Sequence, residues 1–430
     1  MGEPLTGKRR PGGLLWHRNF RLFWFGETVN QLGSAMAVVG VPLLAVIGLR
    51  ASPFEVGALV AAAWLPWLVI GLPAGAWVDR LPTRPLMIIC DVISAVLYAS
   101  VPVAYWLHAL TIAQLLVVEL LAGGAAVFFY TAYQVNLPSL VSAAELVEGN
   151  AKLQGSASAA SLGGPGLAGV IAQALGVATA LLFNAVSYLV SASCLIAIHS
   201  SEPRQESGGR PPFRLRRDVG EGIRLVFGDP YLRQLSLFGG LANFALDGYA
   251  AVMVVFLVRV VGLSAGPVGV LLAVPGVGGV AGALAARRVA ARLGTARTML
   301  ASTLCALPFA LLAPLAAAGP RLAFYVVGIL VAATGVGIAN VIQATFRQTY
   351  CPAGILGRVT ATMRFVTFGT SPLGALAGGA LATWLGPRNG LWIMLGILAV
   401  SATVLLTPHF LGRRDLPEAS AAVTSAQVPI

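Results

Sequence analysis

Charged side chains are scarce in this sequence. Lys, Arg, Asp and Glu make up 10% of its 430 residues, whereas a soluble domain carries about 25% charged residues. Hydrophobic residues account for 57% of the chain. This balance excludes an ordinary soluble domain and favours a protein that spans a membrane.

Cysteine and histidine are equally rare, at four residues each. Three cysteines lie inside apolar runs, so no disulfide framework is expected. His108, His199 and His409 lie at the edges of such runs without the spacing of metal ligands, so we expect no bound metal. The sequence has no Gly-Lys-Ser/Thr phosphate loop and no nucleophile–base pattern. We therefore expect neither an ATP-driven pump nor an enzyme, and no cofactor.

Apolar runs dominate what is present. A run of roughly 18 or more apolar residues is long enough to cross the hydrocarbon core as a helix. The sequence predicts twelve such spans, at 20–47, 54–78, 86–106, 111–134, 150–175, 178–198, 235–258, 266–285, 298–317, 322–343, 359–385 and 391–408.

Basic residues fix the expected orientation. If the first residue is cytoplasmic and each run crosses once, all but four of the 28 Lys and Arg residues lie inside; the exceptions are Arg50, Arg259, Arg321 and Arg388. An excess of Lys and Arg marks cytoplasmic loops. We therefore expect a multi-pass protein of the cell membrane with both termini cytoplasmic. The net charge of +12 is spread over alternate loops, which favours contact with anionic lipid over nucleic-acid binding.

Composition along the chain predicts five segments. They are a cytoplasmic tail at 1–19, a six-helix bundle at 20–199, a cytoplasmic linker at 200–233, a second six-helix bundle at 234–410 and a disordered tail at 411–430. Within the linker, Leu215, Val219, Ile223 and Val226 share one helical face. That pattern predicts a helix on the membrane surface.

The two predicted bundles repeat each other. At an offset of 210 residues, LVEGNAKLQ (146–154) aligns with LGRVTATMR (356–364), and Gly164, Gly169 and Gly176 align with Gly374, Gly379 and Gly386. The loop at 75–84 likewise matches 282–292. Two six-helix halves in one orientation are typical of transporters whose substrate site lies between the halves.

The loop at 75–84 reads GAWVDRLPTR. Gly75 would let its helix approach a neighbour, and Asp79 near a helix end can pair with a loop arginine such as Arg80 or Arg84. We expect a polar clasp that holds one conformational state. The loop is similar to the loop motif of the major facilitator superfamily, which Gly75, Asp79, Arg80 and Arg84 match.

A second motif, GGPGLAG at 163–169, is similar to the antiporter motif of the same superfamily. Gly164, Pro165 and Gly169 match it. Small residues permit close helix packing and the proline kinks the helix, so ordinary packing is the alternative interpretation.

Longer stretches at 52–80, 136–154 and 356–379 resemble the drug, macrolide and enterobactin exporters of this superfamily, and the likeness covers about 18–408. It implies an all-α membrane protein with twelve transmembrane helices in two pseudo-symmetric six-helix bundles. It also implies export of a drug-like or natural-product molecule (antibiotic, macrolide or siderophore class) in exchange for protons. We expect a monomer, although the sequence does not fix the oligomeric state.

Three acids lie well inside predicted spans, namely Glu27, Glu119 and Asp247. An ionisable residue in hydrocarbon is costly and normally faces the bundle interior, where it has a function. Because burial disfavours the charged form of a carboxyl, each of these acids is a candidate proton carrier. The superfamily often has a buried arginine on its fourth helix. Glu119 takes that position here, so an arginine-centred relay does not carry over.

Neutral polar residues near these acids are candidates for the substrate cavity. Asn30 and Gln31 follow Glu27 by three and four positions, and Asn243 precedes Asp247 by four. The remaining candidates are Tyr130, Asn340 and Gln343. Aromatic packing is the alternative for the first of these, and loop anchoring for the other two.

Three functions remain open from the sequence: a proton-coupled exporter, a nutrient importer by proton symport on the same fold, and a membrane receptor or assembly partner that transports nothing. The antiporter-like motif favours the first over the second. The mid-span acids argue against the third, because a passive scaffold gains nothing from them.

Overall fold

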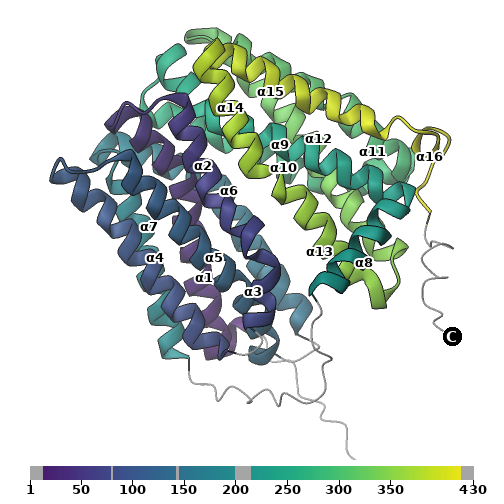
Figure 1. The fold of residues 1–430 in the computed structure, drawn as a ribbon, viewed down its shortest axis with the longest axis horizontal. Helices are drawn as coiled ribbons and strands as arrows, with labels where there is room; N and C mark the ends of the chain where they lie inside the picture. The colour runs from purple at the N-terminus through teal and green to yellow at the C-terminus, as the bar shows by residue number, and fades with distance from the viewer. Residues whose placement is uncertain (1–12, 79–80, 142–144, 199–214, 418–430) are drawn as a thin grey trace, which may run out of the picture.

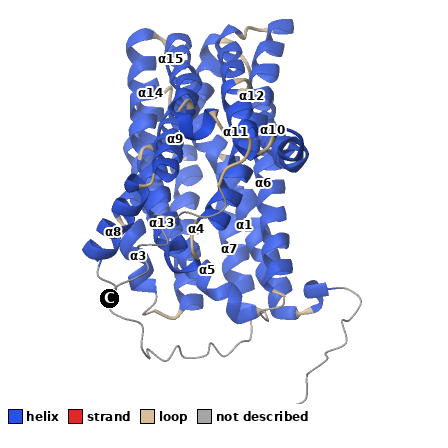
Figure 2. Ribbon diagram, turned by 90° about the vertical axis from the view of Figure 1, so that its right-hand side faces the viewer, coloured by secondary structure: helices blue, strands red, loops and turns tan. Residues whose placement is uncertain are grey.

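The computed structural model describes residues 13–78, 81–141, 145–198 and 215–417. These residues form helices and short connections without strands (Figure 2). We refer to 13–198 as the N-terminal half and to 215–417 as the C-terminal half.

The N-terminal half contains seven α-helices and two short turns of other helix types. In chain order these are η1 (Gly13–Trp16), α1 (Arg18–Leu43), η2 (Leu44–Gly48), α2 (Pro53–Val69), α3 (Gly71–Val78), α4 (Thr83–Trp106), α5 (Ile112–Leu140), α6 (Leu146–Leu175) and α7 (Thr179–Ala197).

The C-terminal half follows the same plan with more interruptions. Its elements are α8 (Leu215–Gly228), α9 (Pro230–Val255), η3 (Phe256–Val260), α10 (Ala265–Leu293), α11 (Thr295–Leu304), η4 (Leu307–Leu315), η5 (Gly319–Arg321), α12 (Leu322–Tyr350), α13 (Ala353–Gly369), α14 (Ser371–Leu385), α15 (Pro387–Ser401), η6 (Ala402–Leu405) and α16 (Pro408–Leu411).

Ten helices in the described part of the chain are long and apolar enough to cross a membrane. The two predicted spans outside this set are 54–78 and 150–175. The first is interrupted at Ile70 between α2 and α3. The second is α6, a continuous helix whose Gly, Ser and Ala residues make it less hydropathic. Small residues suit α6 because it packs between α1 and α10.

Local sequence explains where several helices begin and end. Ser52 and Glu55 form a capping box at the start of α2, with Pro53 in the first turn. Asp229 caps α9 by accepting hydrogen bonds from the amides of Tyr231 and Leu232. Gly176 and Gly386 both follow a helix with positive φ, at 97° and 87°, a conformation that glycine adopts without strain. Their equivalence supports the 210-residue repeat.

The helices assemble into two bundles that lean together at one end (Figure 1). In the N-terminal half α1 packs on α6 and α7, while α5 packs on α2 and α4. In the C-terminal half α9 packs on α14 and α15, and α10 on α12. The main contacts between the halves join α6 to α10 and α2 to α14.

The predicted linker at 200–233 and the predicted tail at 411–430 both contain ordered parts. The linker contains a helix, and the start of the tail packs on the C-terminal half. Helix α8 packs on α13, where Gly222 contacts Thr362 and Val226 is buried. The chain after α16 binds α11, because the Arg414 carbonyl accepts from the amide of Ala296 and Asp415 accepts from Thr295. The predicted disordered tail is therefore wrong for 411–417, because these contacts hold the backbone.

Candidate functional site

Glycines close the contact between the halves at one end. A Cβ placed at Gly169 would lie 2.6 Å from the carbonyl oxygen of Ala265 and 2.7 Å from the Cα of Gly269. At the second contact, a Cβ at Gly57 would lie 2.5 Å from the carbonyl oxygen of Ala375 and 3.1 Å from the Cα of Gly379. The backbones of α6 and α10, and of α2 and α14, therefore approach as closely as only glycine allows.

Hydrogen bonds join the halves at the same end. Arg259 Nη2 donates to the carbonyl of Ala51 at 2.6 Å. The amide of Phe54 donates to Thr383 Oγ1 at 3.0 Å, and the amide of Gly266 donates to Gln173 Oε1 at 2.8 Å. These residues lie at the ends of α1, α2, α9 and α10 that are remote from residues 18 and 230. The space between the two halves is therefore closed at this end.

The antiporter-like motif contributes directly to this closure. Gly164 faces Ala35 of α1 within the N-terminal half. Gly169 faces α10 across the interface, and the carbonyl of Pro165 lies against Gly269. The motif therefore provides close packing between α6 and α10, whereas its role in antiport stays a prediction.

An acidic cavity of about 560 Å³ opens in the N-terminal half. It contains Glu27 and the polar side chains around it on α1, together with aromatic side chains from α2, α5 and α7. Its main lining residues are Glu27, Asn30, Gln31, Ser34, Trp67, Asp91, Ser94, Phe129, Tyr130, Tyr133, Gln154 and Tyr188. The structure thus brings together Glu27, Asn30, Gln31 and Tyr130 from the sequence prediction.

A basic cavity of about 330 Å³ lies in the C-terminal half. Its polar lining consists of Asn243, Thr303, Asn340, Gln343, Arg347, Arg364 and Thr367. Asn243, Asn340 and Gln343 were predicted as cavity residues, and the structure places them together.

A third cavity of about 490 Å³, which we call the bridging cavity, adjoins these two. It shares Gln154 with the acidic cavity and Asn340 with the basic cavity. Most of its lining is apolar, from α9, α10 and α12. The three cavities therefore lie next to one another, and we refer to them together as the cleft.

Glu27 is 7% exposed although it lines the acidic cavity. Its Oε1 accepts a hydrogen bond of 2.7 Å from Gln31 Nε2, one turn along α1. One turn further, Ser34 Oγ lies 3.4 Å from Asn30 Oδ1. The polar stripe predicted on this helix therefore faces the cavity.

Asp91 is the acid that sequence reasoning missed. It lies on α4 in the acidic cavity and is 1% exposed, with the Ser191 side chain beside its carboxylate. Its charge is close enough to interact with that of Glu27. The signal was available, because Asp91 lies inside the predicted span at 86–106 and the cost of burying an acid applies to it equally.

Glu119 lies behind the acidic cavity rather than in it. It is 9% exposed and accepts a hydrogen bond of 3.1 Å from the hydroxyl of Tyr98. Tyr98 stacks on Tyr188 with ring centroids 5.9 Å apart, and the Tyr188 hydroxyl lies 3.4 Å from Ser34 Oγ. Two tyrosines therefore separate Glu119 from the cavity.

Asp247 is separate from both groups. It is half-buried on α9 and lies near the hydroxyl of Ser371 of α14. The neighbouring Asn243 faces the basic cavity but donates to the carbonyl of Gly239 at 2.9 Å. Asp247 lines none of these three cavities, and its role as a proton carrier stays a prediction.

The clasp loop is described only in part. Gly75 lies in α3, and Asp79 and Arg80 lie outside the described residues. Arg84 at the start of α4 donates from Nε to the carbonyl of Leu195 at 2.7 Å and from Nη2 to that of Ile196 at 2.8 Å. It ties α4 to the end of α7.

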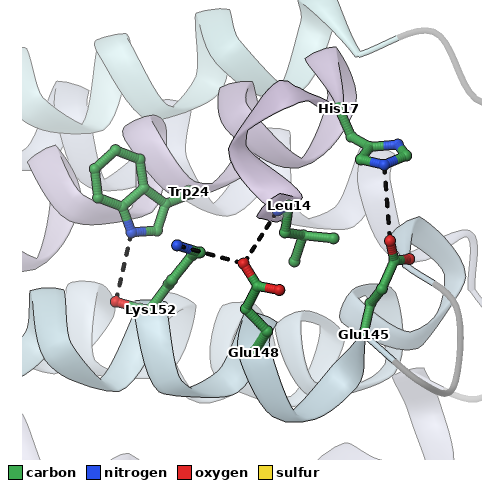
Figure 3. A network of polar contacts seen from close by, with 6 residues as sticks. All are labelled: Leu14, His17, Trp24, Glu145, Glu148 and Lys152. Carbon is green, nitrogen blue, oxygen red and sulfur yellow. Dashed lines mark hydrogen bonds and ion pairs between the residues drawn. The ribbon is translucent and has the colours of Figure 1, made fainter. Parts of the chain in front are cut away.

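A polar network fixes the start of α1 to α6 (Figure 3). Glu148 Oε1 accepts from the amide of Leu14 at 3.1 Å and lies 3.5 Å from Lys152 Nζ. His17 Nε2 lies 3.7 Å from Glu145 Oε1. These two acids are thereby held within the N-terminal half.

Tyr130 packs in an aromatic group at the mouth of the acidic cavity. Its ring meets Trp67 edge to face at 5.5 Å and stacks with Tyr133 at 6.4 Å. Trp64 continues the aromatic surface to the other half, where it stacks on Phe368 at 5.6 Å. Aromatic rings therefore line the cleft as well as pack its walls.

Comparison with known proteins places the fold. The family model of the Major Facilitator Superfamily matches residues 23–371. The multidrug efflux pump Tap of Mycolicibacterium fortuitum is 26% identical over 397 residues, which cover 88% of this chain and 94% of that protein. A structure of a nucleoside transporter NupG mutant matches with a TM-score of 0.75 at 13% identity, over 90% of this chain and 99% of that one. A bacterial homologue of the iron transporter ferroportin in an inward-facing state matches with a TM-score of 0.74 at 17% identity, over 92% and 98%.

Proposed function

Because this chain belongs to the Major Facilitator Superfamily, we propose that it is a proton-coupled exporter of a drug-like or natural-product molecule. The family is one of multi-pass membrane transporters rather than enzymes. Antibiotics, macrolides and siderophores are the cargo classes that the sequence likeness suggests.

One observation carries the proton coupling. Glu27 is a nearly buried carboxyl in a cavity of about 560 Å³, with one hydrogen bond to a neutral amide and no basic side chain among the residues that line the cavity. A carboxyl in such a place can be reached from the cleft, yet its charged form gains little stabilisation from the protein. That combination suits a group that binds and releases protons.

Two observations support export rather than import: the name of a similar protein, and the position of the antiporter-like motif in the contact between the halves. The relative in M. fortuitum is named a multidrug efflux pump. Gly169 and the Pro165 carbonyl of the antiporter-like motif lie where the halves touch, so they are placed to influence the exchange of states. The cleft is closed at the loops that we assign to the outside. If both termini are cytoplasmic, the structure is the inward-open state that loads cargo.

Transport in inverted membrane vesicles tests this function. Vesicles acidified inside should accumulate a fluorescent cargo, and a protonophore should abolish the accumulation. Accumulation that persists without the gradient and requires ATP would overturn the proposal.

A further inference from the structure

The two ends of the cleft carry opposite charge. Glu27 and Asp91 are the charged residues that line the acidic cavity, and Arg347 and Arg364 are those that line the basic cavity. The bridging cavity has no charged residue in its lining. A molecule that fills the cleft therefore meets acids, then an apolar surface, then two arginines.

Neither arginine has a counter-charge among the residues that the structure describes. No hydrogen bond or ion pair joins either guanidinium to another residue in the described ranges. The two groups come from different helices, α12 and α13, and are close enough for their charges to repel. Arg347 is half-buried and Arg364 is exposed, and both line the cavity, so an anion in the cavity can reach both guanidinium groups. An anionic group between these two would relieve the repulsion, and a guanidinium binds a carboxylate through two parallel hydrogen bonds.

The amides around the arginines complete a polar site. Asn340 and Gln343 lie on the same helix as Arg347 and line the same cavity. Both can donate hydrogen bonds to an anion. The basic cavity therefore offers charge and neutral donors together.

The acidic cavity is built for the opposite charge. Asp91 is 1% exposed, and no basic side chain lines the cavity with it. Phe129 and Tyr133 line the same cavity and present aromatic rings. Carboxylates and aromatic faces both attract an organic cation.

We propose that the cleft binds an amphoteric organic molecule, with its cationic nitrogen in the acidic cavity, its apolar body in the bridging cavity and its carboxylate or similar acidic group between Arg347 and Arg364. This inference rests on the proposed function as an exporter and specifies its cargo. Each of the three cavities is of a size that ligand pockets commonly have.

A matched pair of dyes tests the anion site. A rhodamine with a free carboxyl group is amphoteric at neutral pH, and its methyl ester is a cation with the same ring system. Binding to the purified full-length protein in lipid nanodiscs is measured by fluorescence anisotropy, without a proton gradient. We expect the free acid to bind about tenfold more tightly than the ester, a ratio equivalent to ~1.4 kcal/mol.

Variants then locate that preference. In the double variant Arg347→Gln/Arg364→Gln the free acid should lose its advantage, while the affinity for the ester changes by less than about twofold, because the ester never used the arginines. Arg297→Gln removes an exposed arginine of α11 and serves as the control that keeps the preference.

Several results would overturn the anion site. They are equal binding of the two dyes, binding of neither, a preference that survives in the double variant, or an equal loss of affinity for both dyes. The last result would identify the arginines as a gate or a structural element. None of these outcomes depends on proton coupling, so the exporter proposal would stand or fall separately in the vesicle assay.

Discussion

At the end of α6 in the N-terminal half and of α14 in the C-terminal half, the chain turns at a glycine with nearly the same positive φ, 97° at Gly176 and 87° at Gly386. The cavities between the helices differ instead. The N-terminal cavity holds two acids and the C-terminal cavity two arginines. The repeat therefore supplies a shared backbone for rocking the halves, and the side chains give each half its own chemistry.

The largest effect expected from breaking this asymmetry is at Glu27. Glu27→Gln keeps the size and the possible contact with Gln31 but removes the titrating group, so gradient-driven export should fall to background. Export is measured in inverted vesicles over roughly pH 5.5–8.5, a range wide enough to include the titration of a buried carboxyl.

Glu55→Gln provides the matched control for this change. It makes the same substitution in the capping box of α2, where glutamine can also cap, and it should transport normally. Export by Glu27→Gln that still responds to pH would place the proton site at Asp91, Asp247 or Glu119.

The next largest effect should come from the contact between the halves. Gly169→Ala places a methyl group 2.6 Å from the Ala265 carbonyl oxygen. Overpacking of this kind costs about 1–3 kcal/mol, which would shift the balance of states by roughly 5- to 150-fold. The distance between spin labels at Arg50 and Val260 should increase and export should fall.

Gly166→Ala tests whether that effect is specific. Gly166 lies three residues earlier in α6, and a Cβ there would meet no atom within 4 Å. The label distance should stay unchanged in this variant. If both variants behave alike, general helix propensity rather than the contact between the halves explains the result.

A smaller loss is expected at Asp91. Asp91→Asn removes a charge from the acidic cavity but leaves Glu27, so the affinity for the rhodamine methyl ester should fall about tenfold, or ~1.4 kcal/mol. Asp91→Glu should recover part of that affinity. Unchanged affinity in the asparagine variant would mean that cations bind elsewhere in the cleft.

The smallest expected effect is a difference in stability between substitutions in the two loops that match in sequence, at 75–84 and 282–292. Arg84→Gln removes two hydrogen bonds from a charged donor to the end of α7 and should lower stability by about 1–2 kcal/mol. Arg292→Gln changes the corresponding arginine of the C-terminal half, which is exposed, and should be neutral. Thermal unfolding of the two purified variants checks the difference, and equal destabilisation would contradict the assignment.

The length of the apolar runs was sufficient to predict a bundle of long membrane helices, because a membrane requires each spanning segment to pair its own backbone groups. The orientation predicted from the basic loops stays a prediction. The break at Ile70 had a local signal that run length does not use, because Gly71 and Pro73 follow it and a proline removes the backbone hydrogen bond to the residue four positions earlier. Of the site, the polar stripe of Glu27, Asn30 and Gln31 could be read from helical spacing. The partnership of Asp91 with Glu27 could not, because it joins α1 to α4 through tertiary packing.

The charge segregation of the cleft was likewise beyond the sequence. Arg347 and Arg364 lie on different helices, and their shared cavity follows from how α12 and α13 pack. Loop anchoring and substrate contact gave the same sequence pattern for their neighbours Asn340 and Gln343. The structure places these amides in the cleft, while their contact with cargo stays a prediction.

The most direct test of proton-coupled export is to measure proton movement while cargo crosses the membrane. Purified protein in liposomes that contain a pH-sensitive dye is given the rhodamine methyl ester on one side, with no ATP present. We predict that cargo movement in one direction drives protons in the other, and that Glu27→Gln abolishes the proton signal. If the wild-type protein moves cargo across the membrane and no protons move, the proposed antiport is contradicted.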